Sequence, residues 1–292
     1  MLARHRLATA FAIVLGVSLA LISRSQAETP LESGAYLMNG PVACGNCHTP
    51  RGPDGVRLPD RELAGGFVIE EPGLFTAHVP NITPDPETGI GKWTDAQIIA
   101  TIREGKRPDG SIIGPPMPIG FYRSLSDIDV TAIVAYLRSV KPVSNKVGKS
   151  TYLMPLPPAY GPPVTSVPDV LRKDKVAYGA YIAGPLAHCL ECHTPHLMDG
   201  RLDETKLGAG GFVLQGPWGE TISANITPDK ATGLGEWTDK EIKTAITKGV
   251  RKNGSKLAPP MGYDFYATMS EADLDALVAY LRSMTPIENK IR

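Results

Sequence analysis

Apolar residues recur at helical spacing in two similar stretches, one in each half of the chain. Ser126 and Ser270 precede these stretches, and each is followed three residues later by an aspartate, which is typical of a helix N-terminus. Intervals of three and four residues place side chains on one face of an α-helix. Each half therefore predicts a helix with one buried face. The apolar positions are Ile128, Ile133, Val134 and Leu137 in the first stretch and Leu274, Leu277, Val278 and Leu281 in the second.

Other helix starts also occur in pairs. Two of the predicted helices should end near Gly105 and Gly249, because glycine readily adopts the backbone conformation of a helix C-terminus. Alternation of the kind that marks β-strands is weak throughout the chain. The sequence therefore predicts an all-α protein in which a few helices are joined by long loops. The caps of these helices are Thr29 with Pro30 and Glu32, Thr94 with Gln97, Asp174, and Thr238 with Glu241.

An internal repeat explains why the elements come in pairs. Residues 44–50 and 65–68 have counterparts 145 residues later, and after one deletion the offset becomes 144. The chain is therefore predicted to contain two tandem modules, residues 28–140 and 173–292. The motifs at the second offset are Asn-Ile-Thr-Pro-Asp at 81–85 and 225–229, Trp-Thr-Asp at 93–95 and 237–239, Pro-Pro-Met at 115–117 and 259–261, and Ala-Tyr-Leu-Arg-Ser at 135–139 and 279–283.

Residues 141–172 form a proline-rich linker between the two modules. Proline disfavours helix and stiffens an extended chain. The linker also carries apolar and aromatic side chains, among them Tyr152, Leu156 and Tyr160. Packing against the modules is therefore at least as good an expectation as a free connector.

The N-terminus predicts export from the cytoplasm. Arg4 and Arg6 precede an apolar run at 11–22, and Ala27 ends a short segment of small residues suited to cleavage. We therefore expect residues 1–27 to be a signal peptide and the mature protein to be periplasmic. An uncleaved membrane anchor is the alternative, but the apolar run is shorter than the ~20 residues that span a bilayer.

The charge balance gives no reason to expect nucleic acid as a partner. The chain has 30 basic and 30 acidic residues. Removing residues 1–27 takes away three arginines and no acid, so 27 bases remain against 30 acids. A nearly neutral chain has no electrostatic attraction for nucleic acid or for an anionic membrane. We expect contact with a membrane only through a partner.

All four cysteines lie in two Cys-x-x-Cys-His motifs, residues 44–48 and 189–193. This is the attachment sequence of c-type haem, in which two thiols form thioether bonds to the porphyrin and the histidine ligates the iron. The sequence therefore predicts two covalently bound haem c groups. The residues that hold them are Cys44, Cys47 and His48 in the first module and Cys189, Cys192 and His193 in the second.

Three other roles for the cysteines fit the sequence less well. In a zinc site built from two Cys-x-x-Cys pairs, about 15–20 residues usually separate the first pair from the second. Here 141 residues separate Cys47 from Cys189. A thioredoxin-like redox pair does not require a histidine after each motif. Structural disulfides would leave His48 and His193 without a role.

Met117 and Met261 are the predicted distal ligands of the two irons. Each follows a Pro-Pro pair, and they lie 69 and 68 residues beyond their haem histidines. Ligation by histidine and methionine raises the reduction potential of haem iron. A buried core methionine is the alternative role. His78 is a less favoured ligand, since the second module has no histidine at the matching place.

Together the repeated motifs resemble the cytochrome c subunits of bacterial periplasmic dehydrogenases, including membrane-bound alcohol, aldehyde and gluconate dehydrogenases. The resemblance covers nearly all of the mature chain, twice. Those subunits typically carry three haem modules and a membrane-associating tail, so the two motifs found here leave the partner open. The resemblance implies that Thr83, Thr227, Trp93 and Trp237 line the haem pockets, with tryptophan or asparagine donating to a haem propionate. An equally good expectation is that these residues only pack in the core and cap local structure.

The sequence thus predicts a dihaem electron carrier without catalytic residues of its own. It would accept electrons from a periplasmic dehydrogenase and deliver them to a further cytochrome or a terminal oxidase. An iron with six ligands has no free position for a substrate. A dihaem peroxidase or a thiosulfate-oxidising cytochrome is the alternative, because each requires one iron with an accessible or unusual ligand.

Overall fold

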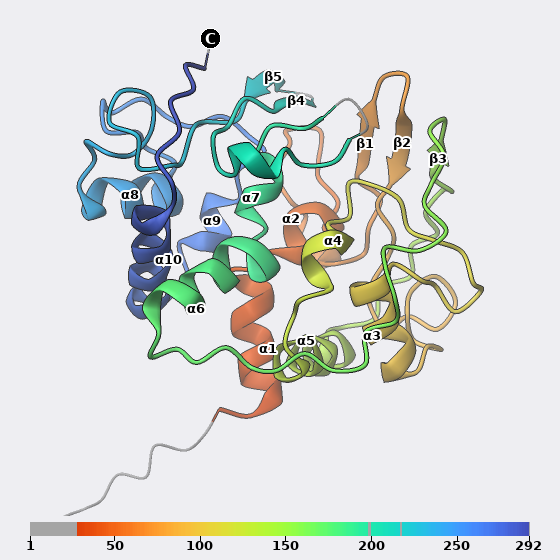
Figure 1. The fold of residues 1–292 in the computed structure, drawn as a ribbon. Coiled ribbons are helices and arrows are strands. Elements are labelled where there is room, and N and C mark those ends of the chain that lie inside the picture. Colours follow the sequence, from red (N-terminus) through yellow and green to blue (C-terminus); the bar gives the residue numbers. More distant parts are fainter. Residues whose placement is uncertain (1–27, 198–199, 217, 292) are drawn as a thin grey trace, which may run out of the picture.

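The computed structural model describes residues 28–197, 200–216 and 218–291, and the predicted signal peptide lies outside this part of the chain. Two modules of similar topology lie against each other (Figure 1). In each, the first helix leads to the Cys-x-x-Cys-His motif and the longest helix comes last. Nowhere in the described ranges is a helix both long and apolar enough to cross a bilayer.

The elements of the two modules follow the same order. In the first module they are α1 (Pro30–Asn39), α2 (Cys44–His48), the 3-10 helix η1 (Pro59–Arg61), β1 (Val68–Glu71), β2 (Phe75–His78), α3 (Asp95–Glu104), α4 (Ile119–Tyr122) and α5 (Asp127–Ser139), and the linker adds β3 (Thr151–Tyr152). In the second they are α6 (Lys175–Tyr181), the π-helix η2 (Ile182–Leu186), α7 (Cys189–Cys192), the 3-10 helix η3 (Glu204–Lys206), β4 (Val213–Gly216), β5 (Gly219–Ile222), α8 (Asp239–Lys248), α9 (Tyr263–Tyr266) and α10 (Glu271–Ser283).

Each module is built on a close crossing of its first and last helices. α1 packs on α5, and α6 packs on α10. A Cβ atom on Gly34 would lie 2.0 Å from the carbonyl oxygen of Ala132, and one on Gly179 would lie 1.9 Å from that of Ala276. Only glycine allows the two backbones to come this close. The crossing fixes the direction in which each first helix delivers its haem motif.

The predicted helix caps are confirmed. Thr29, Thr94 and Thr238 each form a capping box with the glutamate or glutamine three residues later. The hydroxyls of Ser126 and Ser270 accept from the N–H three residues on. The helices α3 and α8 end at glycines in the left-handed conformation, as predicted.

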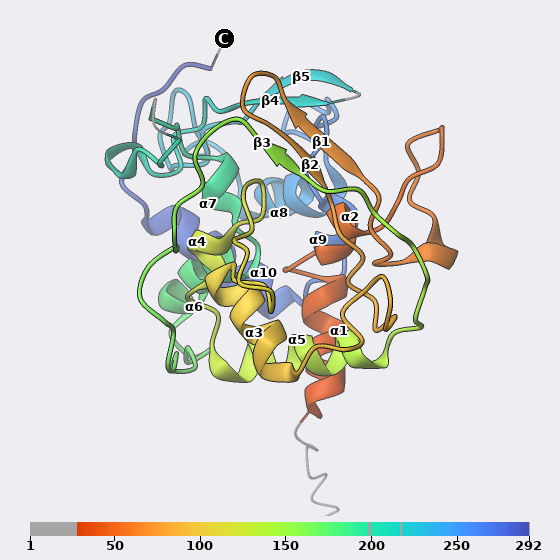
Figure 2. The same cartoon turned by 90° about the vertical axis from the view of Figure 1, so that its right-hand side faces the viewer.

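The prediction of an all-α chain was wrong, because each module also contains a β-hairpin. β1 pairs antiparallel with β2, the linker strand β3 adds to β2, and β4 pairs with β5. No strand among these exceeds four residues, so alternation over so few positions does not stand out from a loop. The backbone turns at Gly73 and Gly219, whose φ angles are +79° and +91°. The two hairpins lie at one end of the molecule (Figure 2).

The linker lies along the first module. The carbonyl of Val143 accepts from the Asn81 side chain at 2.7 Å. Further on, β3 joins the sheet, and Ser166 donates to Asp127 at the start of α5 at 2.7 Å. Most of the linker therefore packs against the first module and is not a free connector.

Candidate haem centres

Both haem motifs start from a residue in the left-handed backbone conformation. Ala43 and His188, which precede the first cysteines, have φ angles of +50° and +38°. For residues other than glycine this conformation is costly and is held only by the surrounding structure. The motif then forms a single helical turn, which places the two cysteines on one face and the histidine beside the first of them. The same donor set is therefore assembled in both modules.

The four cysteines form no disulfide, and the surroundings of their thiols do not favour a thiolate. Burial raises the pKa of both Cys44 and Cys189 to about 12. Reactive redox cysteines have lowered pKa values, so a thioredoxin-like role is disfavoured. In the described part of the chain, no three Cys, His, Asp or Glu side chains come together as a metal site would require. Pairs of thiols next to one histidine remain, which is the donor set of haem c.

Each haem histidine is held in the form that can ligate iron. His48 Nδ1 lies 2.9 Å from the Pro80 carbonyl, and His193 Nδ1 lies 2.7 Å from the Ala224 carbonyl. A carbonyl can only accept, so Nδ1 carries the proton and the Nε2 lone pair is free. Burial also lowers the pKa of both histidines, although the carbonyl contact partly opposes this shift. Both imidazoles are therefore neutral, and their orientation is fixed by the backbone.

A glycine brings that carbonyl to the histidine. Gly65 donates its N–H to the His48 carbonyl at 2.7 Å and has a φ angle of +70°. A Cβ atom at this position would lie 2.4 Å from the Pro80 carbonyl carbon. Gly210 makes the equivalent contact with His193, also at 2.7 Å. The repeated Gly-Gly-Phe-Val motif therefore has a structural role beside the haem histidine.

The repeated asparagine has its hydrogen-bonding groups occupied within the protein. Asn81 donates to Thr88 at 3.0 Å and to the Val143 carbonyl at 2.7 Å, and its oxygen accepts from Thr83. Asn225 makes the same set of contacts in the second module. These contacts support the capping role rather than donation to a haem propionate.

The distal-ligand candidates lie on loops with matching backbones. Met117 and Met261 are half-buried, and Met117 packs against the hydrophobic core. The Pro-Pro peptide bond before each of them is cis. His78 lies on β2 with its ring beside Gly148. Ligation of the irons by the two methionines stays a prediction.

A tyrosine of the first module binds the start of the last helix of the second. Tyr36 on α1 donates its hydroxyl to Asp273 at 2.5 Å, and it accepts from the Ser270 N–H at 3.0 Å. Asp273 is almost fully buried. The hydroxyl therefore joins two segments that lie more than 230 residues apart in the sequence.

A tyrosine of the second module makes the equivalent contact with the start of the last helix of the first module. Tyr181 on α6 donates to Asp129 at 2.5 Å and accepts from the buried Ser126 N–H at 2.9 Å, at the start of α5. Tyr36 and Tyr181 occupy equivalent positions of the repeat. The modules therefore face each other through a pseudo-two-fold interface, in which equivalent residues make reciprocal contacts.

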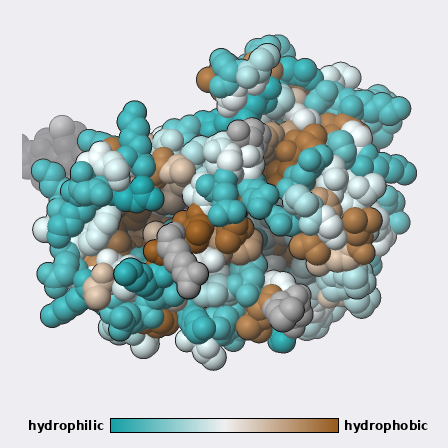
Figure 3. Space-filling model, turned by 90° about the horizontal axis from the view of Figure 1, so that it is seen from above, coloured by the Kyte–Doolittle hydropathy of each residue, from teal (hydrophilic) through white to brown (hydrophobic). Residues whose placement is uncertain are grey.

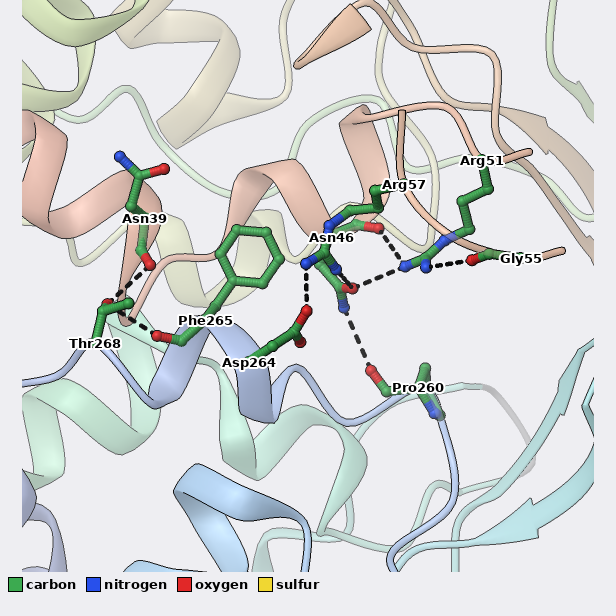
Figure 4. A network of polar contacts seen from close by, with 9 residues as sticks. All are labelled: Asn39, Asn46, Arg51, Gly55, Arg57, Pro260, Asp264, Phe265 and Thr268. Carbon is green, nitrogen blue, oxygen red and sulfur yellow. Dashed lines mark hydrogen bonds and ion pairs between the residues drawn. The ribbon is translucent and has the colours of Figure 1, made fainter. Parts of the chain in front are cut away.

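The first haem motif and the loop that follows it contact the Pro-Pro-Met loop and α9 of the second module (Figure 4). Asn46 donates to the Pro260 carbonyl at 3.3 Å. Arg57 pairs with Asp264 and lies over the Phe265 ring, with its guanidinium carbon 4.4 Å from the centroid. These contacts place the segment that carries Met261 against the other module.

Tyr122, which is buried, and Tyr266, which is partly buried, lie near both haem motifs. The Tyr122 ring meets His188 of the other module edge-on, with 5.8 Å between centroids. Burial raises the pKa of Tyr122 well above its usual value, and electrostatic interactions with its own module's cysteines and with Glu191 raise it further. Burial also raises the pKa of Tyr266, with contributions from the second module's cysteines and from Cys47. The two motifs therefore lie close together across the interface.

The end of the molecule that carries the hairpins exposes apolar side chains. Hydrophobic residues form separate areas between polar ones on this face (Figure 3). Exposed side chains include Val68 and Leu74 on or beside the first hairpin and Val213 and Trp218 on or beside the second. The face is thus mixed in character.

Some site residues could not be found from residue type. The carbonyls of Pro80 and Ala224 act through the backbone, which no side-chain pattern reveals. Tyr36 and Tyr181 could have been found, because the repeat places both of them on first helices at the same position.

Known proteins share both the modules and the motifs. A family model described as cytochrome c matches residues 32–141 and again 176–285. The cytochrome c subunit of alcohol dehydrogenase (quinone) from Gluconobacter oxydans (strain 621H) is 31% identical over 259 residues, which cover 84% of this chain and 52% of that protein. The fructose dehydrogenase cytochrome subunit of Gluconobacter japonicus is 30% identical over 274 residues, covering 89% and 54%. This chain therefore spans about half the length of these two subunits.

A further relative is similar over most of its own length. A diheme cytochrome c-type protein of Cereibacter sphaeroides is 29% identical over 258 residues, covering 84% of this chain and 83% of that protein. Each matched module of this chain has its own Cys-x-x-Cys-His motif, so its cofactors are two haem c groups. The chain belongs to the cytochrome c family.

Proposed function

We propose that this chain is an exported, periplasmic dihaem cytochrome that carries electrons from a periplasmic dehydrogenase to a further cytochrome or a terminal oxidase. The observation that supports this most is the reciprocal packing of the modules, which places Tyr122 of the first module against His188, directly before the second haem motif, and joins Asn46 of the first motif to the loop before Met261. Redox groups held on one fixed interface can exchange electrons without movement of the modules. The chain would act as the electron-transfer partner of an enzyme rather than as the catalyst.

The cysteines would attach each haem covalently, and the histidine and the methionine would ligate its iron. Bound haem supplies one-electron chemistry between ferrous and ferric iron. The hydrogen bond from each haem histidine to a backbone carbonyl fixes the imidazole and increases its basicity. A methionine thioether as the second protein ligand would favour ferrous iron and raise the potential. The residues proposed to hold the first haem are Cys44 and Cys47 as attachment sites with His48 and Met117 as iron ligands, and those for the second are Cys189 and Cys192 with His193 and Met261.

The nature of the donor is proposed from the relatives. Several of them are named as cytochrome subunits of alcohol, fructose and gluconate dehydrogenases. The acceptor is proposed from the family resemblance, and the periplasmic location and contact with the membrane only through a partner are proposed from the N-terminal pattern and the charge balance.

The test uses the mature chain, produced in a bacterial host with c-haem maturation. Mass spectrometry of the denatured chain should show two added haems, and a reductive titration should take up two electrons. Reduced protein should pass electrons to an oxidase, while it reduces peroxide slowly and binds carbon monoxide poorly. In the native host, it should co-purify with a dehydrogenase whose substrate reduces both haems.

Three results would overturn the proposal. A chain that carries fewer than two covalent haems would remove its chemical basis. Rapid peroxide reduction, or a high-spin haem in the resting protein, would favour a peroxidase. Direct reduction by thiosulfate would favour an enzyme that acts on a small molecule.

A further inference from the structure

The linker places two tyrosines on the loop that precedes Met117. Tyr152 donates its hydroxyl to the Pro115 carbonyl at 3.1 Å. Tyr160 donates its hydroxyl to the Ile113 carbonyl at 2.8 Å. Both acceptors lie within four residues of Met117. The backbone of this loop is therefore held from outside the loop itself.

The tyrosines belong to a segment that is fixed before and after them. Before them, β3 pairs with β2, and the Tyr152 ring packs on Phe75 with 5.9 Å between centroids. After them, Arg123 donates to the Pro162 carbonyl at 2.5 Å, and the Val164 N–H donates to Glu104 at 3.0 Å. The two hydroxyls are thus presented by an anchored segment.

A difference between the repeats shows that this contact belongs to the first module only. A Cβ atom on Gly114 would lie 2.5 Å from the Tyr152 ring and 2.7 Å from Leu156. The loop can accept the ring only because residue 114 is glycine. The equivalent residue of the second module is Ala258, whose methyl group would exclude a ring in that place. The second loop is contacted instead by Asn46 of the first module, as described above.

We propose that residues 151–160 form a strap that holds the Met117 loop and makes Met117 harder to displace from iron than Met261. The inference rests on the proposed ligation of iron by both methionines. An external ligand can replace a methionine only when its loop moves away. In the first module, such movement breaks two hydrogen bonds and the packing of the Tyr152 ring on Gly114. Tyr152 and Tyr160 are therefore positioning residues that act through the loop backbone.

The test measures ligand displacement at one haem at a time. In a Met261→His background, only the first haem can give the near-infrared charge-transfer band of methionine bound to ferric iron. Imidazole is titrated into the oxidised holoprotein, and loss of this band gives the apparent affinity. Tyr152→Phe and Tyr160→Phe should each raise that affinity about fivefold, because each change removes one hydrogen bond and keeps the ring. The double variant should show a larger increase.

Gly114→Ala and Ala258→Gly form a matched pair. Gly114→Ala should displace the Tyr152 ring and raise imidazole affinity at the first haem at least as much as Tyr152→Phe. Ala258→Gly, measured at the second haem in a Met117→His background, should change affinity less than about twofold. Haem content and far-UV circular dichroism show whether each variant is folded. If Gly114→Ala does not fold, the imidazole affinities of the two tyrosine variants test the strap without it.

The outcomes separate this inference from the proposed ligation. If the Met261→His protein with an intact strap gives no near-infrared band, Met117 is not a ligand, and both the ligation and the strap are refuted. If the band is present and the tyrosine variants titrate like the protein with an intact strap, only the strap is refuted. Equal imidazole affinity at the two haems, measured in the Met261→His and Met117→His backgrounds, would also refute it.

Discussion

Removing the Tyr36 hydroxyl should weaken the contact between the two modules. Tyr36→Phe keeps the ring but leaves Asp273 without its 2.5 Å hydrogen bond. The Asp273 side chain is only 2% exposed, and its charged partner Arg172 lies 3.5 Å away. A hydrogen bond to a charged group contributes about 1.5–3 kcal/mol. Ser270 is exposed, so water can replace the Tyr36 hydroxyl as the acceptor of the Ser270 N–H. We expect the free energy of unfolding to fall by about 2–3 kcal/mol.

The reciprocal tyrosine should contribute less. Tyr181→Phe affects Asp129, which is half-buried and can be hydrated, and the Ser126 N–H, which is fully buried. We expect a loss of about 1–2 kcal/mol, mostly from the amide. Tyr136→Phe is the control, since its hydroxyl makes only long contacts of 3.3 and 3.4 Å within the first module. It should cost less than about 0.5 kcal/mol.

The assay is urea unfolding of the holoprotein at neutral pH. Burial raises the pKa of Tyr36, so its hydrogen bond is present at neutral pH and is lost only as the pH rises through that raised value. The unmodified protein should unfold in one transition, whereas the Tyr36→Phe, Tyr181→Phe double variant should show two as the modules separate. A Tyr36→Phe protein that unfolds at the same urea concentration as Tyr136→Phe would refute the reasoning.

Three further predictions concern the haems and the linker. Replacing both cysteines of one motif by alanine, Cys44 with Cys47 or Cys189 with Cys192, should reduce the haem-to-chain ratio after acid-acetone extraction, since both thioether bonds to that haem are lost; an unchanged ratio would contradict the attachment. Met117→His should lower the potential of the first haem, and Met261→Ala should admit carbon monoxide at the second; an unaltered redox titration or no carbon monoxide binding would remove that methionine from the site. The linker contact depends on Asp127, whose pKa is lowered by hydrogen bonds from the linker serine and a buried arginine. This stabilisation is present above the ordinary carboxyl pKa and is lost as the pH falls through the lowered value. Asp127→Asn should therefore speed proteolysis of the linker at neutral pH, and equal rates for both proteins would refute the contact.

The helices and the haem motifs could be predicted because local chemistry determines them. Capping residues such as Thr94 and Ser126 satisfy N–H groups only a few residues away, so the signal lies within one short window. The cysteine motifs are equally local. The hairpins were missed because their stability comes from pairing and packing across the chain, while each strand is only half-buried and very short.

The interface escaped prediction for a related reason. Tyr36 and Tyr181 sit among apolar neighbours on the first helices, where an aromatic side chain is equally suited to the core of its own module. Their hydroxyls find partners only because the two modules pack face to face. The carbonyls that orient His48 and His193 are likewise set by the fold of a loop, which glycine at position 65 or 210 permits.

Two differences between the copies lie where a module contacts something outside itself. A Cβ atom on Gly45 of the first haem motif would lie 3.1 Å from the Phe265 ring of the other module, and the second motif has Leu190 at this position. Gly114 accepts the linker's Tyr152, and the second module has Ala258. The hydrogen bonds of the haem histidine and of the repeated asparagine are the same in both modules, so each can hold its haem in the same way.

The divergent positions therefore determine how two similar centres come to differ. Position 45 shapes the contact between the modules, and position 114 shapes the contact between the linker and the Met117 loop. Exchanging residues between the copies at position 114 alone should alter ligand displacement at the first haem without disturbing the interface. Exchanging them at position 45 should weaken the interface, since a side chain there meets Phe265, and should leave the Met117 loop unchanged. If either exchange produced both effects, the interface and the strap would be one coupled structure rather than two separate ones.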